Sequence, residues 1–86
     1  MNESEVRRRV RQFIESTFLG EMDPSELQDD SSLEQLHLVD SMRSMDLILF
    51  VEETFGVTVE NDEALPENFD SVSNVVGFVT RKRAGG

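Results

Sequence analysis

The sequence predicts an all-α domain, a bundle of three main helices plus one short helix. Three stretches carry apolar residues three and four positions apart, which is the period of an α-helix that buries one face. Strand-like alternation is almost absent, and a long loop separates the first helix from the second. A chain of 86 residues suffices for one domain, which we assign to residues 1–86.

The first predicted helix lies near the N-terminus. Asn2, with Glu5 three residues later, fits a capping box, and Gly20 fits the end of the helix. Its apolar positions are Val6, Val10, Phe13, Ile14 and Phe18. We expect these side chains to form one wall of the core.

The segment 20–40 is predicted to be a long loop with a short helical turn over Pro24–Gln28. Its leucines are expected to anchor it to the core: Leu27, Leu33, Leu36 and Leu38. An irregular segment of about twenty residues is unusual in a compact domain and is often functional. This one leads directly to Asp40 and Ser41.

The second predicted helix runs from Ser41 to Phe55 and ends at Gly56. Its apolar residues fall on two sides when successive residues are placed roughly 100° apart. One side, expected to face the core, holds Leu47, Ile48, Val51 and Phe55; the other holds Met42, Met45 and Leu49 with Asp46 and Glu53. Burying two carboxylates in so small a domain is costly, so we interpret the second side as a docking face for partner proteins.

The rest of the chain is predicted to contain a short extended segment at 57–59, a turn or brief helix within 62–69, and the last main helix. This helix begins near Asp70 or Ser71. Its apolar positions are Val72, Val75, Val76, Phe78 and Val79, and its basic C-terminal end holds Arg81, Lys82 and Arg83. Residues 84–86 are expected to form a flexible tail.

The net charge of −10 is concentrated in the middle of the chain. Thirteen of the eighteen acids lie in residues 20–63, where Arg43 is the only base. A field of this sign repels nucleic acid and attracts basic protein surfaces. We therefore expect protein partners and no nucleic acid.

Composition argues against several functions. The chain has no Cys, so it lacks a thiolate nucleophile, a disulfide and a cysteine-based zinc site. The single histidine, His37, has no nucleophile beside it in the sequence, and we expect it to be a packing residue of the loop. A domain of this size leaves little volume for a deep catalytic pocket. No apolar run approaches the roughly 20 residues of a membrane span. We expect a cytoplasmic monomer that is not an enzyme and holds no metal.

Ser41 stands between Asp40 and Met42 at the predicted start of the second helix. Free backbone N–H groups and the positive end of the helix dipole favour an attached phosphate at this position. Asp and Ser are also preferred N-cap residues, so the dipeptide alone is more typical of an ordinary helix cap.

The order of these features resembles the acyl carrier and peptidyl carrier protein family over about residues 5–82. Three motifs carry the resemblance: Asp40-Ser41-Met42, where the family has Asp-Ser-Leu; Glu52-Glu53-Thr54-Phe55 at the end of the second helix; and Ser71-Val72 at the start of the last helix. The resemblance implies a discrete, stand-alone carrier. It also implies a covalent 4′-phosphopantetheine arm on Ser41, derived from coenzyme A, whose thiol holds cargo as a thioester.

The resemblance further implies a set of partner enzymes. A phosphopantetheinyl transferase would modify Ser41 with coenzyme A and magnesium, and Asp40 would help position the site for it. A loading enzyme would attach the acyl or aminoacyl group, and a downstream synthase or transferase would use it. The residues that would contact these enzymes are Met42, Met45, Asp46, Leu49 and Glu53, with Glu52 at the edge of the face.

The sequence departs from the fatty-acid carriers near the modified serine. Leu38 stands where many of them have Gly, Val39 follows it, and Arg43 interrupts the acidic face. An apolar pair here resembles discrete carriers of cell-wall D-alanylation or specialised metabolite pathways, which implies a dedicated pathway. The cargo stays open between an aminoacyl group loaded by an adenylating enzyme, a modified malonyl group and a simple acyl chain.

Two other classes compete with the carrier interpretation. The terminal Gly85-Gly86 is typical of ubiquitin-like proteins, but those need the alternating strands that this sequence lacks. The acids of 23–30 and 60–63 invite comparison with calcium-binding helix pairs, but neither segment has their ligand spacing. We expect neither function.

Overall fold

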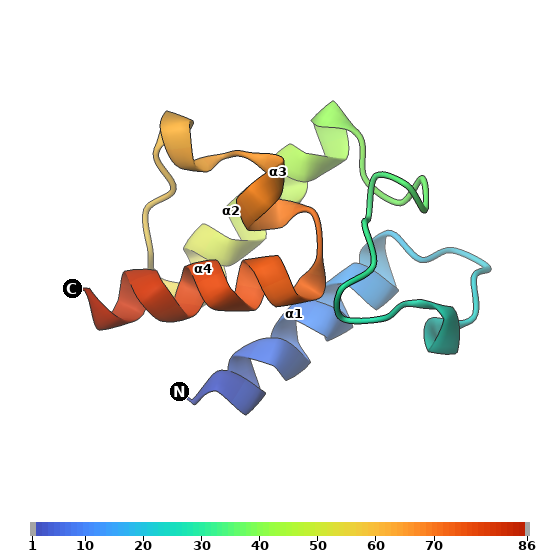
Figure 1. The fold of residues 1–86 in the computed structure, drawn as a ribbon, viewed down its shortest axis with the longest axis horizontal. Coiled ribbons are helices and arrows are strands. Elements are labelled where there is room, and N and C mark those ends of the chain that lie inside the picture. The colour runs from blue at the N-terminus through green and yellow to red at the C-terminus, as the bar shows by residue number, and fades with distance from the viewer. Residues whose placement is uncertain (1, 86) are drawn as a thin grey trace.

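The computed structural model describes residues 2–85, and all regular structure within them is helical. The elements in chain order are α1 (Glu3–Thr17), a 3₁₀ turn (Pro24–Glu26), α2 (Ser41–Phe55), a second 3₁₀ turn (Asn61–Glu63), α3 (Pro66–Phe69) and α4 (Val72–Ala84). Figure 1 shows the three long helices with the short α3 beside α4. The predicted all-α bundle with a long first loop is confirmed.

The largest helix–helix contact joins α1 and α4, and α3 packs against both α4 and α2. In Figure 1 the two ends of the chain lie at the left, whereas α2 begins at the upper right. The start of α2 is therefore remote from the basic last turn of α4, which holds Arg81, Lys82 and Arg83.

Each main helix buries the face that its apolar spacing predicts. The buried residues are Val6, Val10 and Ile14 of α1, Leu47, Val51 and Phe55 of α2, and Val72, Val75, Val76, Phe78 and Val79 of α4. The rings of Phe13 and Phe50 stack with their centroids 4.1 Å apart, which closes the contact between α1 and α2.

The loop between α1 and α2 is held to α1 by one carboxylate. Asp29 accepts hydrogen bonds from the guanidinium groups of Arg7 at 2.8 Å and Arg11 at 3.0 Å. Arg11 also donates to the carbonyl oxygen of Leu27 at 2.8 Å. These donors satisfy polar groups of an irregular segment that has no helix or sheet to satisfy them.

The same loop is fastened to the start of α4. The backbone N–H of Leu33 donates to the carbonyl oxygen of Asp70 at 2.7 Å, and the N–H of Ser73 donates to the carbonyl oxygen of Asp29 at 2.8 Å. Leu27, Leu33 and Leu38 are buried as expected, and Leu36 packs half-buried against the core. The anchoring role predicted for the four leucines is confirmed.

The helix ends differ from the prediction in detail. Asn2 caps α1 by accepting the N–H of Glu5 at 2.8 Å, but the carboxylate of Glu5 faces Arg8 and Arg9. This is half of the predicted capping box. The short turn ends at Glu26, two residues before the predicted Gln28.

The C-terminal end also differs from the expected tail. Ala84 is the last residue of α4 and Gly85 is its C-cap, so the helix extends into the segment 84–86. Gly86 lies outside the described residues. Within residues 2–85, no helix combines the length and the apolar character needed to cross a bilayer.

Replacing a leucine by alanine should lower the free energy of unfolding much more on the buried side of α2 than on its exposed side. Leu47 is fully buried, so Leu47→Ala should lower the free energy of unfolding by about 2–5 kcal/mol through lost burial and a cavity. Leu49 is exposed, so Leu49→Ala should change it by less than about 0.5 kcal/mol. Urea unfolding measures both values, and equal losses would show that α2 has no free face.

Candidate functional site

The first turn of α2 is capped by Asp40. Its Oδ1 accepts the backbone N–H of Met42 at 3.0 Å and that of Arg43 at 2.9 Å, and its carbonyl oxygen accepts the N–H of Ser44. Asp40 has the extended backbone of an N-cap residue, so Ser41 is the first residue inside the helix. The ordinary-cap interpretation therefore applies to Asp40 and not to Ser41.

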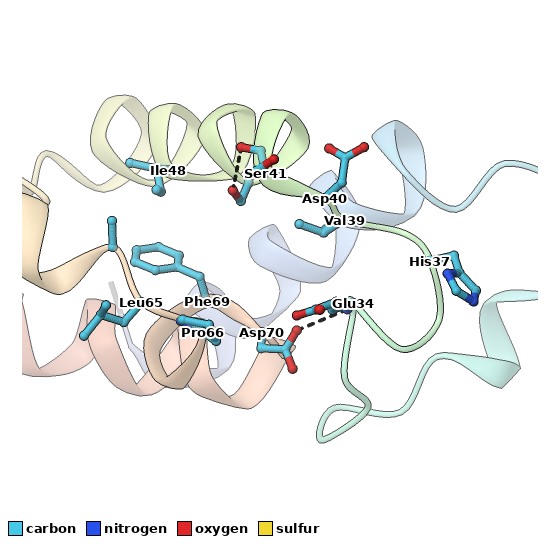
Figure 2. Close-up of a pocket in the computed structure, with 12 residues that line it drawn as sticks. Glu34, His37, Val39, Asp40, Ser41, Ile48, Leu65, Pro66, Phe69 and Asp70 are labelled. Carbon is cyan, nitrogen blue, oxygen red and sulfur yellow. Dashed lines mark hydrogen bonds between the residues drawn. The ribbon is translucent and has the colours of Figure 1, made fainter.

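Ser41 is left without a structural task for its side chain. It is exposed, and among residues 2–85 no hydrogen bond involves its hydroxyl. Its backbone carbonyl oxygen accepts a bond from the Ser44 hydroxyl at 3.0 Å. A dashed line at Ser41 marks this bond in Figure 2. The expectation of free N–H groups beside Ser41 needs correction, because Asp40 already occupies those of Met42 and Arg43. The hydroxyl of Ser41 is open to an incoming reagent.

The capping bonds also set the charge of Asp40. The backbone N–H of Arg43, helped by that of Met42 and by the Arg43 guanidinium, holds the pKa of Asp40 below its ordinary value of 3.8. Asp40 is thus ionised near neutral pH. The residue beside Ser41 carries a fixed negative charge.

Ser41 lies on the wall of an open cavity of about 630 Å³. The cavity is formed by the loop before α2, the first half of α2 and residues 64–70. Its apolar lining comes from Val39, Ile48, Ala64, Leu65, Pro66 and Phe69. Figure 2 shows Ile48 and Phe69 approaching each other from α2 and α3. The sequence analysis did not foresee this open cavity, because its walls come from two separate stretches of the chain, residues 34–48 and residues 64–70.

Polar groups surround the rest of the cavity. Asp70 accepts bonds from the Ser32 hydroxyl at 2.6 Å and from the backbone N–H of Glu34 at 3.1 Å. Glu34, Asp40 and Asp70 all line the cavity. The segment that opens α4 therefore supplies both an anchor for the long loop and part of the cavity wall.

His37 lines the outer part of this cavity and does not pack in the loop as expected. Its side chain is exposed, and its backbone lies in the left-handed region with φ of 60°. Figure 2 shows its imidazole directed away from Ser41. The packing role is therefore wrong, and His37 is not placed to act as a base on the Ser41 hydroxyl.

The second side of α2 is open to solvent over its whole length. Met42 is 79% exposed, Met45 63% and Leu49 52%, and Asp46 and Glu53 are exposed among them. Glu52 differs, because its carboxylate is half-buried and accepts the backbone N–H of Val59 at 2.9 Å. That bond ties the end of α2 to the extended segment that follows.

Comparison with known proteins agrees with this geometry. The family described as "Phosphopantetheine attachment site" matches residues 8–79. The acyl carrier protein of Thermosynechococcus vestitus is 31% identical over 84 residues, which cover 98% of this chain and 99% of that protein. The acyl carrier protein of Guillardia theta is 30% identical, with the same coverage of both chains. The chain belongs to the acyl carrier protein family.

The cofactor of this acyl carrier protein family member is 4′-phosphopantetheine. The structure fits such a group, because an arm bonded to an exposed hydroxyl needs room beside it. An unengaged serine hydroxyl on the wall of an open, partly apolar cavity provides that room. Membership also implies partner enzymes, among them a phosphopantetheinyl transferase.

The capping carboxylate predicts a pH-dependent stability. The pKa of Asp40 is lower in the folded chain than in the unfolded chain, so its charge stabilises the fold above pH 3.8. This stabilisation is lost as the pH falls through the lowered pKa. Asp40→Ser, which keeps a capping oxygen but removes the charge, should be less stable than wild type near neutral pH.

Urea unfolding at neutral and at strongly acidic pH checks this expectation. The difference between wild type and Asp40→Ser should shrink at acidic pH, where both residues are neutral. A difference of the same size at both pH values would show that the charge of Asp40 adds nothing to the cap.

Proposed function

We propose that this chain carries acyl groups as thioesters on a 4′-phosphopantetheine arm attached to Ser41. The observation that carries the proposal is that Asp40 performs the capping, which leaves the Ser41 hydroxyl exposed beside the cavity. The arm ends in a thiol, which supplies the group that this chain without Cys cannot supply itself.

The attachment is a phosphoryl transfer onto Ser41. Its hydroxyl oxygen forms a bond to the phosphorus of the phosphopantetheine moiety of coenzyme A, and the bond from that phosphorus to adenosine 3′,5′-bisphosphate breaks. The hydroxyl proton passes to a base of the transferase, since His37 is directed away from Ser41. The chain is thus substrate and carrier, and its partner enzymes supply the catalysis.

The exposed side of α2 is the surface that these partners contact. It combines flexible Met side chains, which adapt to more than one partner, with Asp46 and Glu53, which favour a basic partner surface. Met42 and Asp40 place this surface directly beside the modified serine. Glu52 contributes at the edge, where its bond to Val59 orients the end of α2.

The apolar pair before Asp40 supports a carrier with a dedicated pathway, and we place that pathway in the cytoplasm as part of the proposal. Leu38 is buried and Val39 lines the cavity, so both residues shape the approach to Ser41. A specialised metabolite or cell-wall pathway fits this departure from the fatty-acid carriers. An aminoacyl carrier loaded by an adenylating enzyme is the second candidate, favoured by the acidic cavity wall at Glu34 and Asp70.

Ser41 should be the site that accepts the arm. Incubation with coenzyme A, magnesium and a broad-specificity phosphopantetheinyl transferase should add one phosphopantetheine mass to the wild-type chain and none to Ser41→Ala. Ser44→Ala is the matched control, because Ser44 lines the same cavity and its hydroxyl bonds only within the first turn of α2. Intact-mass spectrometry reads all three, and an adduct on Ser41→Ala would refute the assignment.

The docking face should govern the rate of that reaction. Met45→Glu and Asp46→Lys should each slow arm transfer on the order of tenfold at low salt. Met45→Glu would bury a charge in the contact, and Asp46→Lys would repel a basic partner. Circular dichroism should show an unchanged helix content, since both side chains are exposed.

Asp62→Lys serves as the control for this experiment. It makes the same charge change at an exposed residue of the second 3₁₀ turn, which is not part of α2. Equal slowing by Asp62→Lys and Asp46→Lys would show that net charge, and not this face, controls docking.

A further inference from the structure

One basic residue interrupts the acidic surface of α2. Arg43 is the only Lys or Arg of residues 20–63, and it directly follows the exposed Met42. Arg43 is itself exposed, and it precedes Asp46 by three residues, which places the two on neighbouring parts of the helix surface. Neither the attachment of the arm nor the attraction of a basic partner requires a cation at this position.

The charge of Arg43 is not neutralised by a bonded carboxylate. Bases elsewhere in the chain form ion pairs with Asp or Glu: Arg7, Arg8, Arg9, Arg11 and Lys82. Within residues 2–85, Arg43 forms no ion pair, and its guanidinium donates to the carbonyl oxygen of Leu38 at 3.3 Å. A guanidinium has several N–H donors, so this one bond to a neutral acceptor leaves its charge and other donors available.

The position of Arg43 on α2 favours contact with a partner over contact with the arm. With roughly 100° per residue, Arg43 leaves the helix about 160° from Ser41 but only about 60° from Asp46. Arg43 is also absent from the lining of the cavity beside Ser41. It therefore lies at the edge of the docking face that is turned away from this cavity.

Charges of both signs restrict what can dock on this face. Asp46 and Glu53 attract basic groups, whereas Arg43 repels them. A partner surface that is basic throughout gains at the two acids and loses at Arg43. A partner that offers a carboxylate at this one position gains at all three residues, and such a difference is a source of specificity.

We propose that Arg43 selects partner enzymes that place a carboxylate opposite it and basic residues opposite Asp46 and Glu53. The inference rests on the proposed function, because it concerns enzymes that reach Ser41 across the docking face. Enzymes whose contact surface is basic throughout react more slowly with this chain. The dedicated partner thus has a surface of mixed charge.

Removal of the charge tests the repulsive half of this inference. The probe is a phosphopantetheinyl transferase whose carrier-binding surface is basic, used with coenzyme A and magnesium. Arg43→Gln should raise its kcat/KM about threefold at low salt, and the gain should disappear at high salt, where exposed charges are screened. An unchanged or lower kcat/KM at low salt would overturn the inference.

Two further variants separate the charge of Arg43 from other effects. Arg43→Lys keeps the charge and should react at the wild-type rate; a rate equal to that of Arg43→Gln would show that the bond to Leu38 matters and the charge does not. Arg81→Gln removes one charge from an exposed residue in the last turn of α4 and should leave the rate unchanged. Equal gains from Arg81→Gln and Arg43→Gln would assign the effect to net charge and overturn the selection.

A charge reversal on the transferase tests the attractive half. Each Lys and Arg of its carrier-binding surface is replaced by Glu in turn. At one position, the ratio of the wild-type rate to the Arg43→Gln rate should rise about tenfold over the ratio measured with the unmodified transferase. If no position gives such a rise, Arg43 meets no group of the partner and the inference fails.

The outcomes keep this inference apart from the proposed function. Intact-mass spectrometry reports whether each variant carries the arm, and the time course gives the rate. Equal rates for wild type and Arg43→Gln, with the arm added to both, would remove the selection and leave the attachment at Ser41 intact. No arm on the wild-type chain with an active transferase would refute the attachment itself.

Discussion

The site depends on the double attachment of the loop between α1 and α2. Asp29 joins the loop to Arg7 and Arg11 of α1, while Asp70 joins it to the start of α4. The ion pairs of Asp29 with Arg7 and Arg11 are only partly buried, so each contributes little by itself. Together they satisfy the polar groups of a long irregular segment and let Leu33 reach the core. The loop thereby delivers Asp40 and Ser41 to one place beside α3.

Helix α2 has three sides, and the residues on each side have a different role. Leu47, Val51 and Phe55 hold the helix in the core, and Met42 and Met45 remain in solvent. Between these two sides, Ser41 and Ile48 face the cavity. Because a helix turns by roughly 100° per residue, short sequence shifts would exchange these tasks.

Acidic residues serve several purposes in this carrier. Asp40 caps a helix, Asp29 and Asp70 fasten a loop, and Asp46 and Glu53 remain free on the exposed side of α2. Only the last group is available for long-range attraction of a basic partner without loss of a structural bond. Three acidic residues, Glu34, Asp40 and Asp70, are also among the lining of the cavity beside Ser41.

The sequence by itself determined the main helices, their buried faces and Ser41 as the candidate attachment site. Periodic apolar residues and strong stop signals are local, so α2 begins and ends where Ser41 and Gly56 predict. The exposure of Met42, Met45 and Leu49 followed from the same periodicity. Membership in the acyl carrier protein family could also be predicted from the sequence, because the motifs of the family lie at defined positions along the chain.

Only the tertiary structure decided what surrounds Ser41. The sequence placed Ser41 at the start of α2, but the open space beside its hydroxyl depends on where residues 64–70 pack. The cavity joins Val39, Ile48 and Phe69, which packing brings together from separate segments. His37 was misread for a related reason, because its left-handed backbone arises from the path of the chain in space. The bond that Glu52 accepts from the backbone N–H of Val59 depends on the same path.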